Sequence, residues 1–294
     1  MFESSALAQV LVSGIGVGCI YGLIAIGFCV IYNASGIVNF SQGAFVMLGG
    51  MLTHFFMTYY NFPMPVAAVT AVVLVVVVGV AIERLVVRPL WNRNASMFAM
   101  ILATLAVQIV VERATLLFLG DQPKALPVFT DLPPIMLGSV AVSYQLLWNV
   151  GASILLVVIL GVFFKRTLIG KALRACAVDR QAAQLQGIPV SRMLSLAFAI
   201  SAGLGAIAGI LIAPTQYTAF NVGTPFAISG FIAAIIGGFG RPVGAFAGGL
   251  VLGVSQSFAS VAFGSGQKNI AALTILLIFL FFRPSGIMGK AADK

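Results

Sequence analysis

The chain is built from long apolar runs separated by short polar segments, and this pattern restricts its fold more than any other feature. Several runs approach the ~20 residues that a helix needs to cross the hydrocarbon core of a bilayer. Only 8% of the 294 residues are charged, which is too few to solvate a soluble protein of this size. The sequence therefore predicts an integral membrane protein. The apolar runs are 7–32, 40–60, 63–82, 95–119, 144–164, 193–213, 225–240, 243–262 and 268–282.

These runs favour helices over the strands of a barrel. Barrel strands would alternate apolar and polar residues over roughly ten positions, and no run does so. The 32 glycines permit the close helix approach that is common in membranes. We predict an all-α integral membrane protein, a polytopic bundle of about eight or nine transmembrane helices. The run 225–240 is short and glycine-rich, and 40–60 begins with polar residues, so either segment is a candidate broken or re-entrant helix.

The basic residues predict the orientation of the chain. If 83–94, 165–192, Arg241 and the C-terminus are cytoplasmic, that side holds 13 of the 16 Lys and Arg residues. The N-terminus is then outside and the C-terminus cytoplasmic, which requires an odd number of crossings and favours nine. Because the basic residues are divided among loops without interleaved aromatic residues, no nucleic-acid partner is predicted. The proline-rich extracytoplasmic loop 120–143 is either a surface for an external partner or a solvated connector.

Polar residues gather at one point in the apolar pattern, in the stretch GIVNFSQGAFVMLGG (36–50). Asn39, Ser41 and Gln42 lie within four residues, followed by Gly43. Non-helical backbone at membrane depth needs protein or a water-filled cavity to satisfy it. We therefore expect a broken helix that faces the bundle interior, where these residues either line a translocation path or hydrogen-bond a neighbouring helix. Ser229 is a further candidate for the path.

The basic loop 165–192 is longer than a simple connector requires. Its alanine-rich middle predicts a short cytoplasmic helix that ends at Gly187, with Pro189 preventing continuation. A surface of small residues suits docking against a partner protein, but a basic loop that only obeys the positive-inside rule is the alternative. No catalytic or metal-ligating site is predicted, since the only histidine, His54, has no acidic residue in its run.

Three stretches of the sequence resemble a known family over essentially the whole chain. The spacing from Gly170 to Ile188 in the loop resembles the coupling loop of ABC-importer permeases. The stretches 22–50 and 229–253 resemble the branched-chain amino-acid permease family of the LivH type. The resemblance implies that 165–192 is a cytoplasmic coupling loop within a single transmembrane permease domain, 1–294. The positions that match the coupling pattern or contribute to it are Gly170, Leu173, Arg174, Ala175, Asp179, Ala183, Gly187 and Ile188.

The family resemblance also implies the partners and the mechanism. Such a permease pairs with a related LivM-type permease, two cytoplasmic ATPase subunits and an extracytoplasmic binding protein in a bacterial inner membrane, surrounded by lipid. The expected function is import of Leu, Ile and Val by alternating access. The sequence lacks a phosphate-binding loop, so it is predicted to bind no cofactor and to leave ATP to its partners. Permeases for urea, short amides or other amino acids, and a passive facilitator, are alternatives.

Overall fold

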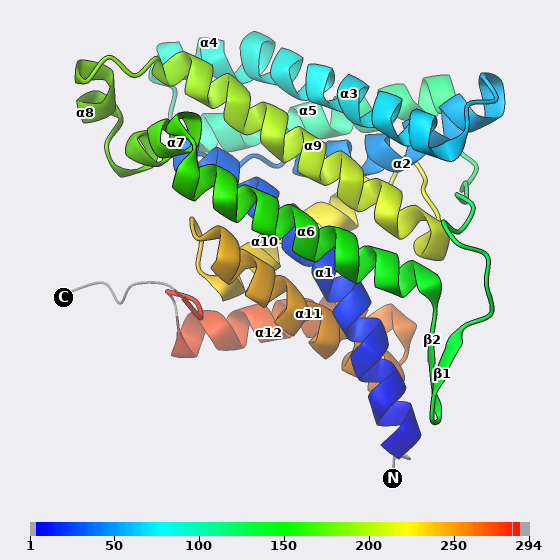
Figure 1. Ribbon diagram of the computed structural model, residues 1–294. Coiled ribbons are helices and arrows are strands. Elements are labelled where there is room, and N and C mark those ends of the chain that lie inside the picture. The colour runs from blue at the N-terminus through cyan, green and yellow to red at the C-terminus, as the bar shows by residue number, and fades with distance from the viewer. Residues whose placement is uncertain (1–3, 284, 289–294) are drawn as a thin grey trace. The chain divides into compact units, whose positions relative to one another are not determined.

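The computed structural model describes residues 4–283 and 285–288, and its regular structure is almost entirely helical (Figure 1). A two-stranded antiparallel hairpin, β1 (Ile135–Leu137) and β2 (Val140–Val142), lies between α5 and α6 in the chain. The helices are α1 (Ser4–Ser35), α2 (Gln42–Tyr59), α3 (Met64–Ile82), the π-helical turn η1 (Glu83–Val87), α4 (Arg88–Asn92), α5 (Met97–Leu119), α6 (Tyr144–Arg166), α7 (Leu168–Val178), α8 (Arg180–Leu185), α9 (Val190–Gln216), α10 (Gly223–Gly237), α11 (Pro242–Phe263), the 3-10 turn η2 (Ser265–Gln267) and α12 (Lys268–Phe282).

Six stretches of the described chain are long and apolar enough to cross a membrane. The prediction of an all-α membrane protein is therefore confirmed, whereas the count of eight or nine spans is not. The difference lies in three helices outside these six stretches: α10 and α12 are shorter, with 15 residues each, and α2 has 18 residues but is less apolar. The six stretches are Ala6–Ser35, Met64–Asn92, Met97–Leu119, Tyr144–Arg166, Val190–Gln216 and Pro242–Phe263.

The chain forms two compact units, each assembled from segments far apart in the sequence. Helices α1, α6 and α10 contribute residues to both units, so no simple linker separates them. A single permease domain, as the sequence suggested, stays a prediction. Unit 1 is Met1–Ile26, Pro127–Val157 and Ile228–Lys294, and unit 2 is Gly27–Leu126 and Val158–Ala227.

Unit 1 is held together by a glycine crossing between α1 and α11. A side chain at Gly18 would meet the backbone of Gly249 and Leu250, and one at Gly253 would meet the backbone of α1. Glycines spaced four residues apart let two helix backbones touch, which replaces the hydrophobic driving force that lipid does not supply. In the same unit, the Gln9 side chain hydrogen-bonds both the backbone nitrogen and the carbonyl oxygen of Ala141, at 2.9 and 3.0 Å, and so attaches the hairpin to α1.

Unit 2 is built around α2, α3 and α9, which pack side by side (Figure 1). Gly49 lies against the backbone of Ala206, and Gly209 against the backbone of Val46, so α2 and α9 approach through small residues. Buried Phe45, Met47, Leu48, Met51, Val75 and Ile82 complete the core around this crossing.

Candidate coupling surface and translocation path

The chain between α1 and α2 is non-helical over residues 36–41 and lies mostly inside the protein. Asn39 is 1% exposed, and Ser41 and Gln42 are fully buried. The Oδ1 of Asn39 accepts hydrogen bonds from the Ser41 backbone nitrogen at 3.2 Å and from the Ser41 hydroxyl at 2.6 Å. Ser41 therefore folds back on the linker and does not cap α2.

Gln42 connects α2 to α9. Its Nε2 donates to the carbonyl oxygen of Ser201 at 3.2 Å, and the Ser201 hydroxyl donates to its Oε1 at 2.5 Å. Of the two roles that the sequence left open for the polar cluster, hydrogen bonding to a neighbouring helix is the one that Gln42 performs in this structure. Its part in transport stays a prediction.

The remaining candidates for the path lie in different units. Gly43 packs directly against the backbone of Gly223 at the start of α10, in unit 2. Ser229 belongs to unit 1, where it is 5% exposed and hydrogen-bonded to Tyr21 of α1.

The loop 165–192 contains two helices, α7 and α8, where the sequence predicted one. Asp179 separates them, because its backbone is extended, with φ −154° and ψ 115°. Its carboxylate accepts from the Ala182 nitrogen at 3.0 Å and so caps α8. Gly187, at φ +79°, ends α8 as expected: its nitrogen bonds the Gln184 oxygen, and the Ile188 nitrogen bonds the Ala183 oxygen.

The loop positions predicted to take part in coupling divide into buried and exposed residues. Leu173 is 3% exposed and Ala183 is 4% exposed, so both side chains hold the loop against the protein. Gly170 is likewise internal, because a side chain there would collide with the backbone of Phe163 at the end of α6. Arg174 and Asp179 face solvent, Ala175 and Ile188 are half-buried, and the roles of all these residues in coupling stay predictions.

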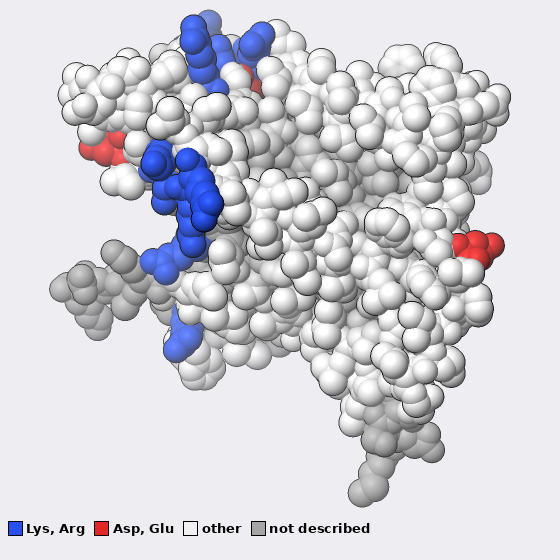
Figure 2. Space-filling model, viewed as in Figure 1, with Lys and Arg blue, Asp and Glu red and all other residues white. Residues whose placement is uncertain are grey.

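Two apolar residues of this loop that the sequence analysis passed over are strongly exposed. Val178 is 88% exposed at the end of α7, and Leu185 is 87% exposed at the end of α8. Their sequence signal is an apolar residue placed beside a helix break in an otherwise basic loop. Exposed apolar side chains away from lipid mark a contact surface. Figure 2 shows Lys and Arg side chains gathered beside α4 and α7.

A polar cavity of about 490 Å³ lies next to this surface, between α8, the end of α4 and the start of α9. Arg180 lines it, with its guanidinium carbon 5.4 Å from the ring centre of Trp91. Burial lowers the pKa of Arg180 from its ordinary value, and the contact with Trp91 partly replaces lost water. The cavity is large enough to receive side chains of a docked protein.

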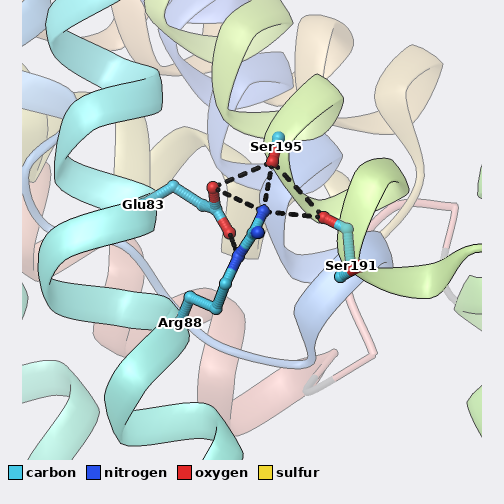
Figure 3. Close-up of polar contacts among 4 residues, drawn as sticks. All are labelled: Glu83, Arg88, Ser191 and Ser195. Carbon is cyan, nitrogen blue, oxygen red and sulfur yellow. Dashed lines mark hydrogen bonds and ion pairs between the residues drawn. The ribbon is translucent and has the colours of Figure 1, made fainter.

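The start of α9 is fixed by a buried ion pair (Figure 3). Glu83 is fully buried, and Arg88 donates to its two carboxylate oxygens at 2.8 and 3.1 Å. The π-helical turn between them, with its bond from the Arg88 nitrogen to the Glu83 oxygen, brings residues five apart onto one face. Arg88 also donates to the Ser191 carbonyl oxygen, and the Ser195 hydroxyl donates to Glu83 at 2.9 Å. This network therefore joins the carboxyl end of α3 to α9.

Helix α5 carries a polar stripe that the sequence analysis also missed. Its buried face consists of Met100, Thr104, Gln108 and Thr115, whereas its exposed residues are apolar except for Arg113. The sequence contains the signal for this stripe: Thr104 and Gln108 are four residues apart, and Gln108 and Thr115 are seven apart, which places all three on one side of a helix. In a membrane helix this arrangement directs polar groups towards the protein interior.

Buried polar groups and six long apolar helices together define a polytopic membrane protein. Comparison with known sequences identifies its family. Residues 10–282 match the family described as "Branched-chain amino acid transport system / permease component", and the chain belongs to this family.

Individual relatives agree over nearly the full length. The chain is 33% identical to the high-affinity branched-chain amino acid transport system permease protein BraD of Pseudomonas aeruginosa, covering 96% of this chain and 95% of that protein. It is 30% identical to the LivH permease of Escherichia coli K12, with the same coverage. A xylose/arabinose import permease, XylH of Sulfolobus acidocaldarius, is 28% identical over 52% of this chain and 43% of its own length.

One solved structure supports the fold. PsaBC from Streptococcus pneumoniae, in complex with a Fab, aligns with a TM-score of 0.52 and 12% sequence identity. The alignment covers 96% of this chain and 93% of that chain.

Proposed function

We propose that the chain is the membrane-spanning permease subunit of an ATP-driven importer for Leu, Ile and Val. The observation that carries this proposal is its similarity over nearly the full chain to BraD and LivH, whose names state branched-chain amino acid transport. Import of urea, short amides or other amino acids is the alternative for the substrate. The buried interior of the bundle offers amides and hydroxyls and few charges, as a zwitterion with an apolar side chain requires.

The partners of this permease are a related LivM-type permease, two cytoplasmic ATPases and an extracytoplasmic binding protein. The exposed Val178 and Leu185 on α7 and α8 support an ATPase docking surface there. The permease itself leaves ATP hydrolysis to these partners and binds no cofactor. Its place is the inner membrane, with nine crossings, the N-terminus outside and the C-terminus in the cytoplasm. Of the basic residues behind that orientation, Lys290 and Lys294 lie outside the described residues.

Transport by the reconstituted complex tests this function. We expect proteoliposomes that contain both permeases, the ATPases and the binding protein to import leucine only when ATP is present. Uptake of urea but not leucine would contradict the substrate, and ATP-independent uptake by the permease alone would favour a facilitator.

Co-purification tests the docking surface. Val178→Asp should remove the ATPases from the purified complex, because a carboxylate at an apolar contact is costly to bury. Met136→Asp is the matched control, since Met136 is 63% exposed at the hairpin in the extracytoplasmic loop. Retention of the ATPases by Val178→Asp, or their equal loss in both variants, would contradict docking at α7 and α8.

A further inference from the structure

Gln108 is a buried amide with no hydrogen-bond partner among the residues that the structure describes. Its side chain is 3% exposed, and neither its Nε2 nor its Oε1 contacts a donor or acceptor within the described part of the chain. Burying an amide without a hydrogen bond is costly. A stabilising role does not explain such a residue, because an apolar side chain of the same shape would avoid this cost. An unsatisfied buried amide is instead suited to a partner that arrives during function.

The amide lies at mid-membrane depth. Gln108 is at the centre of α5, which runs from Met97 to Leu119 and is long enough to span the hydrocarbon core. Groups near the helix ends can reach interfacial water, but a group at the centre cannot. Polar residues placed this deep usually mark a pathway for a substrate or an ion.

The amide also points at the starts of two helices. A Cβ on Gly223, the first residue of α10, would lie 2.8 Å from Gln108 Nε2 and 2.6 Å from the carbonyl oxygen of Gly43. Gly43 is the second residue of α2. The amino ends of α2 and α10 therefore meet beside Gln108, and the residues that meet there, Gly43, Gln108 and Gly223, all belong to unit 2.

Helix amino ends attract anions. Their first backbone N–H groups have no partner within the helix, and the aligned peptide dipoles add a partial positive charge. In secondary transporters, the amino ends of broken helices near the bilayer centre bind the anionic group of the substrate. The glycines at this meeting point let the two backbones touch, since neither carries a Cβ that would hold them apart.

We propose that Gln108 and the amino ends of α2 and α10 form a contact point for the α-carboxylate of the transported amino acid. This inference rests on the proposed function, because it requires an amino acid as the substrate. Gln108 Nε2 donates to a carboxylate oxygen, and its Oε1 is free to accept from the ammonium group. Gly43 and Gly223 are in contact in this structure, so the two helix starts separate to admit the carboxylate.

The linker before α2 is positioned by the same face of α5. The Phe40 nitrogen donates to Thr104 Oγ1 at 3.2 Å, one helical turn before Gln108. One turn after Gln108, Glu112 accepts from the Thr224 hydroxyl at 3.4 Å, next to Gly223. Thr104 and Glu112 therefore act as positioning residues that hold the linker and the start of α10 against α5.

The variant Gln108→Met tests the proposal, because it removes the amide and nearly preserves the volume. We expect the reconstituted importer to move about tenfold less leucine per ATP hydrolysed, as for the loss of one hydrogen bond to a charged group. The thermal unfolding temperature and the amount of assembled complex should stay equal to wild type or rise. If Gln108 had only a structural role, Gln108→Met would instead lower the unfolding temperature and the amount of assembled complex, and the leucine moved per ATP hydrolysed would stay unchanged.

Gln256→Met is the matched control. Gln256 is also 3% exposed with an unpartnered Nε2, but it lies within α11 and not at a helix start. Leucine transport by the Gln256→Met importer should stay within about twofold of wild type. Unchanged transport in Gln108→Met, equal losses in both variants, or parallel losses of stability and transport in Gln108→Met would overturn the inference. Failure of the wild-type complex to import leucine would instead overturn the proposed function.

Discussion

Single side chains decide how the carboxyl end of α3 is fixed to α9. Arg88→Met leaves the Glu83 carboxylate fully buried, with Ser195 as its remaining hydrogen-bond donor among the groups described here. We expect a loss of about 3 kcal/mol in unfolding free energy, at the low end for a broken buried pair because the Arg88 side chain is 29% exposed. Thermal unfolding in detergent measures this loss.

The double variant Glu83→Gln with Arg88→Met is the control for this prediction. It removes the uncompensated charge as well as its partner, so it should regain part of the lost stability. If Arg88→Met and the double variant unfold together at the wild-type temperature, the ion pair contributes nothing to stability.

The thiol of Cys176 gives a second test at this scale. Cys176 lies in α7, outside the spans, and burial raises the pKa of its thiol. A raised pKa means less thiolate at neutral pH, and the thiolate is the reactive form. With Cys19 and Cys29 replaced by alanine, we expect maleimide to label Cys176 slowly at pH 7 and faster at pH 9.

Its control is a cysteine at an exposed position of the same helix. Val178→Cys, in a chain that also carries Cys176→Ala, should react about tenfold faster at pH 7. Equal rates at pH 7 would show that Cys176 is not shielded as the structure indicates.

At the scale of helices, small residues set the distance between α2 and α9. A side chain at Gly209 would collide with the carbonyl oxygen of Val46. Gly209→Val should therefore cost about 3 kcal/mol or more, through forced separation of the two helices. Gly161→Val in α6 is the control, because nothing lies within 4 Å of the added Cβ there. Equal unfolding temperatures for the two variants would contradict a close α2–α9 contact.

The sequence predicted the helical class, the break before α2 and the stop at Gly187 because these depend on local composition. It did not reveal that Gln42 bonds Ser201, 159 residues away, since that contact depends on packing. Leu173 was chosen as a contact residue and is buried, while Val178 was overlooked and is exposed. Burial of this kind depends on how the loop packs against the rest of the protein, which local composition does not show, and the role of Leu173 in coupling stays a prediction.

Across the whole molecule, the orientation in the membrane can be measured with two cysteines. Ser139 is exposed in the turn between β1 and β2, and Val178 is exposed in the loop between α6 and α9. In a cysteine-free background, an impermeant maleimide added to intact cells should label Ser139→Cys and not Val178→Cys. Permeabilised cells should show labelling at both sites. Labelling of Val178→Cys in intact cells would reverse the predicted orientation.

The position of Arg180 connects the loop that contains α7 and α8 to the interior of unit 2. Its guanidinium fills the space beside Gly36, which has no side chain and adopts φ +66°. Gly36 begins the linker whose next residues include Phe40, hydrogen-bonded to Thr104 of α5. A displacement of α8 must therefore either pull the guanidinium off Trp91 or bend the linker at Gly36. In the second case, a push delivered on α8 travels along six residues of chain and arrives where α2 begins.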